Sequence, residues 1–155
     1  MTFSTSIYSK QLSVITKKPR DYGDCHNDVV SILCPLSYAE ISILDDLLVR
    51  DGDRSIRKIR IPNTVKGYGK SSGYRVIVLC NAATQNAYLL YVYAKKGSLA
   101  TDDLTSKGAK ILIDQFDAAQ LAGEQFVPIC VTPPENVVEE LIEAIPAEQL
   151  EQLAE

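Results

Sequence analysis

Residues 66–96 read KGYGKSSGYRVIVLCNAATQNAYLLYVYAKK, and this stretch decides the predicted fold. Two runs of β-branched and aromatic residues, 74–80 and 87–94, lie on either side of the turn-forming segment NAATQN. That arrangement is typical of two antiparallel strands joined by a short loop. The sequence therefore predicts a β-hairpin at the centre of the chain.

A third strand is predicted just before this stretch, over residues 55–61. Ile59 and Ile61 alternate with Lys58 and Arg60, and a proline at position 62 closes the run. Alternation with period two places the isoleucines on one face of a sheet and the basic residues on the other. The three strands in sequence predict an antiparallel meander with an apolar face and a positively charged face.

The loop between the first and second of these strands has a composition suited to polyanions. Lys66, Lys70 and Arg75 fall within ten positions, and three glycines in the same segment allow the backbone to approach a ligand closely. Tyr68 and Tyr74 offer rings on which a base can stack. Cations, glycines and aromatic rings together favour RNA as the ligand.

Two helices are predicted around the meander. Ser37 and Glu40 form an S-x-x-E capping box, Leu36 and Ile41 are placed for a hydrophobic staple, and helical spacing continues to a stop at Gly52. The second helix runs from Thr105 to about Gln120, with Asp103 or Thr105 as N-cap and Gly123 beyond its end, and we expect it to cover the apolar face of the sheet.

The N-terminal region is less determined by its sequence. Residues 3–15 fit either a short strand that enters a helix or a helix alone, and residues 17–28 are polar, with Pro19 and Gly23, and predict a loop. Residues 29–33 form a short apolar segment that is expected to be buried.

Charge divides the 155-residue chain into two parts. Residues 131–155 hold seven glutamates and no Lys or Arg, so residues 1–130 carry sixteen basic against thirteen acidic residues, a net charge of +3. Apolar residues at helical spacing after Pro134 predict an acidic amphipathic helix. The predicted organisation is an α+β domain over residues 1–130, with N-terminal helices packed on a small antiparallel sheet and a closing helix, followed by an acidic helical tail over residues 131–155.

The cysteines and the amino terminus exclude other classes of protein. Cys25, Cys34, Cys80 and Cys130 are widely spaced without a CxxC pair, so neither a disulfide framework nor a zinc site is predicted, and Cys80 and Cys130 are expected to be small buried residues. Cys25 and His26, with the neighbouring aspartates, fit no known metal-ligand spacing. No apolar run is long enough to cross a membrane, and residues 1–12 lack a secretory signal pattern, so the expected location is the cytoplasm.

The order of these parts resembles the RelE/HigB superfamily of bacterial toxins. The likeness covers residues 41–120 and is carried by IRKIRIP, by GKSSGYRVI at 69–77, and by YVYAKK at 91–96. Members are small α+β proteins that cut messenger RNA on the ribosome and are silenced by an antitoxin. The resemblance implies an mRNA endoribonuclease without cofactor or metal, inhibited by an antitoxin that is a helix-turn-helix or partly disordered protein.

The resemblance also implies roles for particular residues. Arg75 matches the family's functional arginine, Lys66 a lysine of the basic loop, and Lys96 a basic residue after the last strand, so these three are the expected catalytic residues. A fixed arginine can stabilise charge on a phosphorane, and Lys66 or Lys70 can transfer a proton if neighbouring cations lower its pKa. The expected RNA-binding residues are Lys58, Arg60, Tyr68, Lys70, Tyr93 and Lys95.

Two departures from the family pattern leave alternatives open. The only histidine, His26, lies outside the matched region, which excludes paired-histidine chemistry, and residues 99–103 lack the tyrosine that some relatives carry there. Tyr68, Tyr91 and Tyr93 are candidate substitutes. The alternative function is a non-catalytic protein of the same fold that binds RNA or a protein partner.

Overall fold

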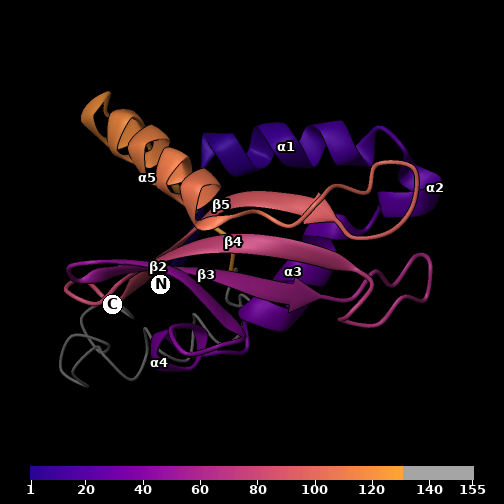
Figure 1. Ribbon diagram of the computed structural model, residues 1–155, viewed down its shortest axis with the longest axis horizontal. Helices are drawn as coiled ribbons and strands as arrows, with labels where there is room; N and C mark the ends of the chain where they lie inside the picture. The colour runs from indigo at the N-terminus through magenta and orange to yellow at the C-terminus, as the bar shows by residue number, and fades with distance from the viewer. Residues whose placement is uncertain (131–155) are drawn as a thin grey trace, which may run out of the picture.

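The computed structural model describes residues 1–130, which form an α+β domain (Figure 1). The predicted acidic helical tail, 131–155, lies outside the described residues. The elements in chain order are β1 Thr2–Ser4, α1 Ser6–Thr16, α2 Pro19–Tyr22, α3 Cys25–Leu33, α4 Tyr38–Ile41, β2 Asp46–Asp51, β3 Arg54–Ile61, β4 Tyr74–Asn81, β5 Asn86–Ala94, α5 Ser106–Leu121 and β6 Val127–Pro128.

One mixed sheet organises the domain, with strand order β2-β3-β4-β5-β1-β6. The predicted meander is confirmed as β3, β4 and β5, each antiparallel to the next. The prediction of a purely antiparallel sheet is wrong, because β1 pairs parallel to β5, with Thr2 opposite Ala87. β1 also pairs antiparallel to β6, so the beginning and the end of the described chain meet in the sheet.

Each face of the sheet is covered by helices and has its own hydrophobic core. On the helical face, Ile59, Val76, Leu89 and other strand residues pack against α1, α2, α3 and α4. On the α5 face, Ile56, Leu79 and Tyr88 are in the same core as Phe116 of α5. Figure 1 shows α3 behind the strands and α1 alongside β5.

The closing helix is confirmed, but the face that it covers differs from the prediction. Thr105 is the N-cap, since its hydroxyl accepts a hydrogen bond from the backbone N–H of Gly108, and Gly123 follows the helix with a positive φ of 78°. α5 packs on the face that also carries Lys58 and Arg60, not on the face of Ile59 and Ile61. The strands are apolar on both faces over most of their length, so both faces need a cover.

The predicted long helix after Ser37 is wrong beyond its first turn. The capping box of Ser37 and Glu40 is present with both hydrogen bonds, but α4 ends at Ile41. The residues from Asp46 to Asp51 form β2 and pair with β3, and the glycine at position 52 adopts its positive φ of 62° between these two strands. Pairing with β3 in a hairpin has overridden the helical preference of this segment.

The N-terminal region resolves into more structure than the sequence predicted. Of the two alternatives for the first segment, the strand entering a helix is confirmed: Thr5 caps α1 by accepting a hydrogen bond from the N–H of Tyr8. The predicted loop at 17–28 is wrong, because α2 and the first turn of α3 lie within it. The apolar segment at 29–33 is the rest of α3.

The expectation for Cys130 is also wrong. Cys34, the C-cap of α3, and Cys130 form a disulfide bond, with Cα atoms 5.4 Å apart, which ties the last described residue to the helical face. A separation of 96 residues gives no local pattern from which this pairing can be predicted. Cys80 is buried, as predicted.

Candidate nucleic-acid interface

Three of the predicted site residues lie in a row across the central strands. In the sheet register Arg60 of β3 is opposite Arg75 of β4, and Arg75 is opposite Tyr93 of β5. Residues directly opposite one another project to the same face, with Cβ atoms roughly 4.5–5.5 Å apart. Like charges in such a pair are unfavourable unless other groups compensate them. The row therefore marks a position where the sheet concentrates positive charge.

A second row, Lys58, Ile77 and Tyr91, lies beside the first. The register of β4 and β5 shifts between Ile77 and Val78, which leaves Leu90 as an extra residue in β5. This β-bulge puts Leu90 and Tyr91, although consecutive, into the same core on the α5 face. Tyr91 and Tyr93 share that face.

Asp103 joins these rows into a polar cluster. Its carboxylate accepts hydrogen bonds from the ammonium of Lys95 at 3.0 Å and the hydroxyl of Tyr93 at 3.2 Å, and the ammonium of Lys58 lies 4.0 Å away. The hydrogen bond from Lys95, and then the charge of Lys58, lower the pKa of Asp103, against the opposing effect of partial burial. Burial raises the pKa of Tyr93 to about 12, so Tyr93 keeps its proton at neutral pH.

The guanidinium of Arg75 is turned into the loop that follows β3. One terminal nitrogen donates to the carbonyl oxygens of Lys70 at 3.0 Å and Tyr74 at 3.1 Å, and the other donates to that of Ser71 at 3.1 Å. Arg75 is 7% exposed. In this arrangement the arginine shapes the basic loop and contributes charge, and its terminal nitrogens are occupied by backbone oxygens.

The helical face holds the other end of this loop. The buried carboxylate of Asp28 accepts hydrogen bonds from the hydroxyl of Thr64 at 2.7 Å and its backbone N–H at 3.1 Å, and the side-chain amide of Asn63 donates to the carbonyl of Asp21 at 2.8 Å. The glycine at position 73 is required, because a Cβ there would lie 2.1 Å from the carbonyl oxygen of Ile61.

The segment after β5 is held by one tyrosine of α2. The buried hydroxyl of Tyr22 donates to the carbonyl of Lys96 at 3.0 Å and accepts from the N–H of Leu99 at 3.1 Å. Gly97, with a φ of 96°, leaves room for that hydroxyl. The ammonium of Lys96 then lies 5.7 Å from the centre of the Tyr68 ring, so the two basic segments meet in a cation–π contact.

The expected role of Lys66 as a proton-transfer group with a lowered pKa is wrong. Its ammonium lies 3.2 Å from the carboxylate of Asp21. The hydrogen bond and charge of that carboxylate raise the pKa of Lys66, opposite to the predicted direction. Lys66 is therefore a cation at neutral pH.

The proposed site residues thus fall into two neighbouring groups. The sheet group consists of Lys58, Arg60, Arg75, Tyr93 and Lys95, and the loop group of Lys66, Tyr68, Lys70 and Lys96. Sequence reasoning missed Asp103 as the centre of the sheet group, and Asp21, Tyr22 and Asp28 as anchors. A signal for Asp103 was present, since it is a carboxylate shortly after the basic pair Lys95 and Lys96.

The other reactive groups of the domain are in the core. Burial raises the pKa of the Cys25 thiol to about 12 and that of Cys80 to about 11, so neither is a nucleophile at neutral pH. His26 lies 2.9 Å from the Tyr8 hydroxyl through Nδ1, and burial lowers its pKa. Among residues 1–130, no group of three metal-ligating side chains is placed to hold an ion.

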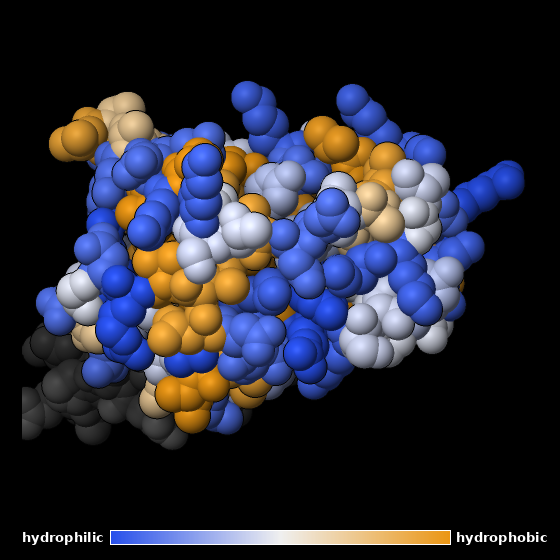
Figure 2. Space-filling model, viewed as in Figure 1, coloured by the Kyte–Doolittle hydropathy of each residue, from blue (hydrophilic) through white to orange (hydrophobic). Residues whose placement is uncertain are grey.

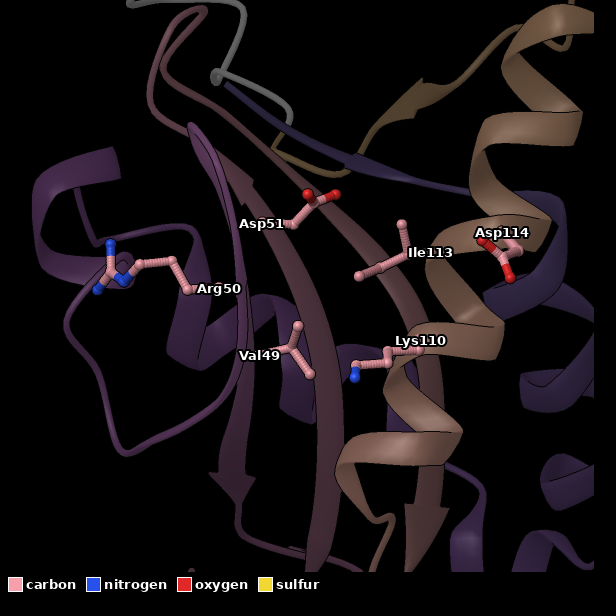
Figure 3. A pocket seen from close by; sticks show the side chains of 6 residues that line it. All are labelled: Val49, Arg50, Asp51, Lys110, Ile113 and Asp114. Carbon is pink, nitrogen blue, oxygen red and sulfur yellow. The ribbon is translucent and has the colours of Figure 1, made fainter.

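A hollow of about 340 Å³ lies away from these groups, between β2 and α5 (Figure 3). Its walls carry charges of both signs, from Arg50 and Lys110 and from Asp51 and Asp114, and Figure 3 shows the Arg50 side chain pointing away from α5. Such mixed charge does not select an anion, so the basic groups remain the better candidate site.

No protein-family model matches this chain, and no curated protein matches it. None of the helices within residues 1–130 has the length and apolar character needed to cross a membrane.

Proposed function

We propose that this protein is the toxin of a toxin–antitoxin pair, an mRNA endoribonuclease of the RelE/HigB type that acts on the ribosome in the cytoplasm. The observation that carries the proposal is the row of Arg60, Arg75 and Tyr93 across three strands. Arg60 lies 3.8 Å from the carboxylate of Asp46, and Arg75 donates to loop carbonyls, so the pair is partly compensated within the domain. Two adjacent guanidiniums still concentrate positive charge that a phosphate can neutralise. The order β3, β4, β5 and α5 supports the sequence resemblance, whereas the helix expected at its start is replaced by β2 over Asp46–Asp51.

The cluster around Asp103 supplies groups suited to cleavage by the ribose 2′-OH. In that reaction the 2′-oxygen loses its proton and forms a bond to the adjacent phosphorus, the P–O5′ bond breaks, and the departing 5′-oxygen takes a proton from water. The products are a 2′,3′-cyclic phosphate and a 5′-OH. The carboxylate of Asp103 takes the 2′-OH proton, and Lys95, 3.0 Å from it, stabilises the charge that develops on the phosphorane oxygens. Lys58 adds a second cation at 4.0 Å from the same carboxylate.

The weakness of this base accounts for dependence on the ribosome. Lys95 and Lys58 lower the pKa of Asp103, and a carboxylate with a low pKa is a poor proton acceptor. Positioning of the mRNA by the ribosome then has to supply much of the rate enhancement. Free RNA is expected to be cut slowly.

An antitoxin is the expected protein partner, and two surfaces are suited to it. The loop lysines attract an acidic segment, which gives a complex that weakens with salt. Figure 2 shows a stripe of hydrophobic side chains from α5 across the β2–β3 region towards α4, where Ile43 is 75% exposed and Leu47 is 42% exposed. Exposed apolar surface of this kind marks a binding site for a partner.

The enzymatic proposal is tested by expression of Lys58→Ala/Lys95→Ala and Asp103→Asn variants. We expect wild-type protein to arrest growth and to produce cleaved mRNA ends in primer-extension assays, and each variant to lose both effects. The control is Lys17→Ala, which removes an exposed lysine at the end of α1. Equal toxicity of all four proteins at equal expression would exclude this site.

A non-catalytic binding function is the second candidate, because the guanidinium of Arg75 donates to backbone carbonyls in place of a ligand. On this alternative the basic surface holds RNA or an acidic protein without cutting it. The primer-extension assay distinguishes the endoribonuclease from the binding protein. Salt-sensitive RNA binding without cleaved mRNA ends, both on ribosomes and with free RNA, supports the binding protein.

A further inference from the structure

A groove of about 280 Å³ opens beside the sheet group, between α1, β5 and α5. Its walls are mostly apolar and come from Ile7, Tyr91, Leu104, Ile111 and Leu112, with the amide of Gln115 at the rim. Pockets for drug-sized ligands span roughly 300–1,000 Å³. The groove is thus suited to a group about the size of a single ring system.

The groove is continuous with the cationic cluster. Tyr91 is opposite Ile77, and Ile77 is opposite Lys58, so the Tyr91 ring and the Lys58 ammonium belong to one row. The ring centres of Tyr91 and Tyr93 are 6.2 Å apart, and Leu104 directly follows Asp103 in the chain. The apolar surface therefore begins where the phosphate-binding cations end.

The far end of the groove leads to another cation. An adjoining hollow of about 330 Å³ is lined by Ser6 and Lys10 and shares Ile7 and Gln115 with the groove. Lys10 is exposed on α1. An aromatic and aliphatic surface with a cation at either end matches the alternation of base and phosphate along single-stranded nucleic acid.

We propose that this groove binds one unstacked nucleobase of single-stranded RNA, next to the phosphate held by Lys58 and Lys95. The inference rests on the RNA-binding function proposed above and assigns a subsite to it. The base stacks on the Tyr91 ring, and the amide of Gln115, which both donates and accepts hydrogen bonds, contacts its polar edge. Lys10 contacts the phosphate on the far side of that base.

A binding experiment tests the subsite without depending on cleavage. The probe is a short single-stranded RNA with a 2′-deoxy sugar at the cut position and 2-aminopurine placed at each position in turn. Wild-type protein should quench the fluorescence at one position through stacking. An abasic nucleotide at that position should weaken binding on the order of tenfold, as expected for loss of one stacked base.

Variants of Tyr91 assign the effect to the groove. Tyr91→Phe keeps the aromatic ring and should quench 2-aminopurine fluorescence as the wild type does. Tyr91→Leu keeps an apolar side chain without the ring. It should bind the parent RNA as weakly as the wild type binds the abasic RNA. Gln115→Ala should change the preference among the four bases at that position. If Tyr91→Leu does not fold, the affinities of wild-type protein for the parent and abasic RNAs still show whether a nucleobase contributes to binding.

Two negative results have different meanings. If the abasic and parent RNAs bind equally while Lys58→Ala/Lys95→Ala abolishes binding, the RNA site stands and the nucleobase subsite is wrong. If no RNA binds and the lysine variants change nothing, the proposed function fails and the subsite with it. Loss of antitoxin binding in Tyr91→Leu, with no dependence on the base, would reassign the groove to a protein side chain.

Discussion

The α5 face of the sheet has a packed end and a charged end, built from the same three strands. At the packed end Ile56, Leu79 and Tyr88 meet Phe116 of α5. At the charged end Arg60, Arg75 and Tyr93 form another row, four or five residues away on each strand. Strand pairing thus fixes the geometry of the site, in which Arg60 is exposed while Arg75 and Tyr93 are 7% and 1% exposed. We expect the packed end to determine stability and the charged end to determine function.

The largest effect should come from the packed end. Leu79→Ala removes a fully buried side chain and is expected to lower the free energy of unfolding by about 2–5 kcal/mol. Leu121→Ala is the matched control, since Leu121 is 91% exposed, and should change it by less than about 0.5 kcal/mol. Urea denaturation measures both. If both substitutions changed the free energy of unfolding equally, the packed end would not be what determines stability.

Arg75→Ala should affect the charged end next most strongly. Loss of three hydrogen bonds to loop carbonyls and of one positive charge is expected to disorder the basic loop and to reduce mRNA cleavage about tenfold to hundredfold, since a hydrogen bond to a charged group contributes roughly 1.5–3 kcal/mol. Arg75→Lys should recover little, because a single ammonium cannot span those carbonyls. Arg50→Ala, which removes an exposed arginine of β2, should cut mRNA normally. Full cleavage by folded Arg75→Ala protein would show that the row is structural.

Asp28 tests whether the helical face holds the charged end in place. Asp28→Ala leaves the hydroxyl and N–H of Thr64 without their acceptor and should cost about 1–3 kcal/mol of stability. Proteolysis within residues 64–72 should become faster. Asp24→Ala, at the exposed N-cap of α3 where the side chain makes no capping hydrogen bond, is the control. An unchanged proteolysis pattern in Asp28→Ala would show that Asp28 does not hold the basic loop in place.

The smallest effect concerns acid stability. The folded-state pKa of Asp103 is lowered from its ordinary value of 3.8, so its contacts with Lys95 and Tyr93 contribute stability above that pH and lose it as the pH falls through the folded value. The difference in melting temperature between wild type and Asp103→Asn should therefore shrink below pH 3.8. Asp102→Asn, at the exposed neighbouring position, is the matched control. A difference independent of pH would mean that charge is not what Asp103 contributes.

The central strands were predictable because their signals are local and agree with one another. Ile59 and Ile61 alternate with Lys58 and Arg60 and are followed by a proline, a pattern that predicts a strand for β3. The turn-forming residues 81–86 predict the hairpin of β4 and β5 in the same way. Those same strands carry most of the site, so the row of Arg60, Arg75 and Tyr93 was present among the predicted residues. Their alignment in one row could not be predicted, because it depends on the register with which the strands pair.

The segment after Ser37 shows where local signals fail. A capping box specifies the first turn of a helix and nothing beyond it, and α4 is one turn long. The register shift between Leu47 and Val49 breaks the alternation of β2, so its apolar residues imitate helical spacing. The partner that decides the matter, β3, follows directly after the turn at Gly52. The parallel β1 and the Cys34–Cys130 bond escaped prediction for another reason, because they join segments that are distant in the sequence.

The insertion of β1 between β5 and β6 has a consequence for the timing of folding. The first strand to be synthesised finds its parallel partner only when residues 87–89 have been made, and its other neighbour only at residues 127–128. Pairings of such long sequence separation form slowly compared with the β3–β5 meander. A nascent chain therefore has a sheet that is open at one edge until almost all of residues 1–130 have left the ribosome. Late closure of the sheet thus delays the complete fold of residues 1–130 until β6 has been synthesised.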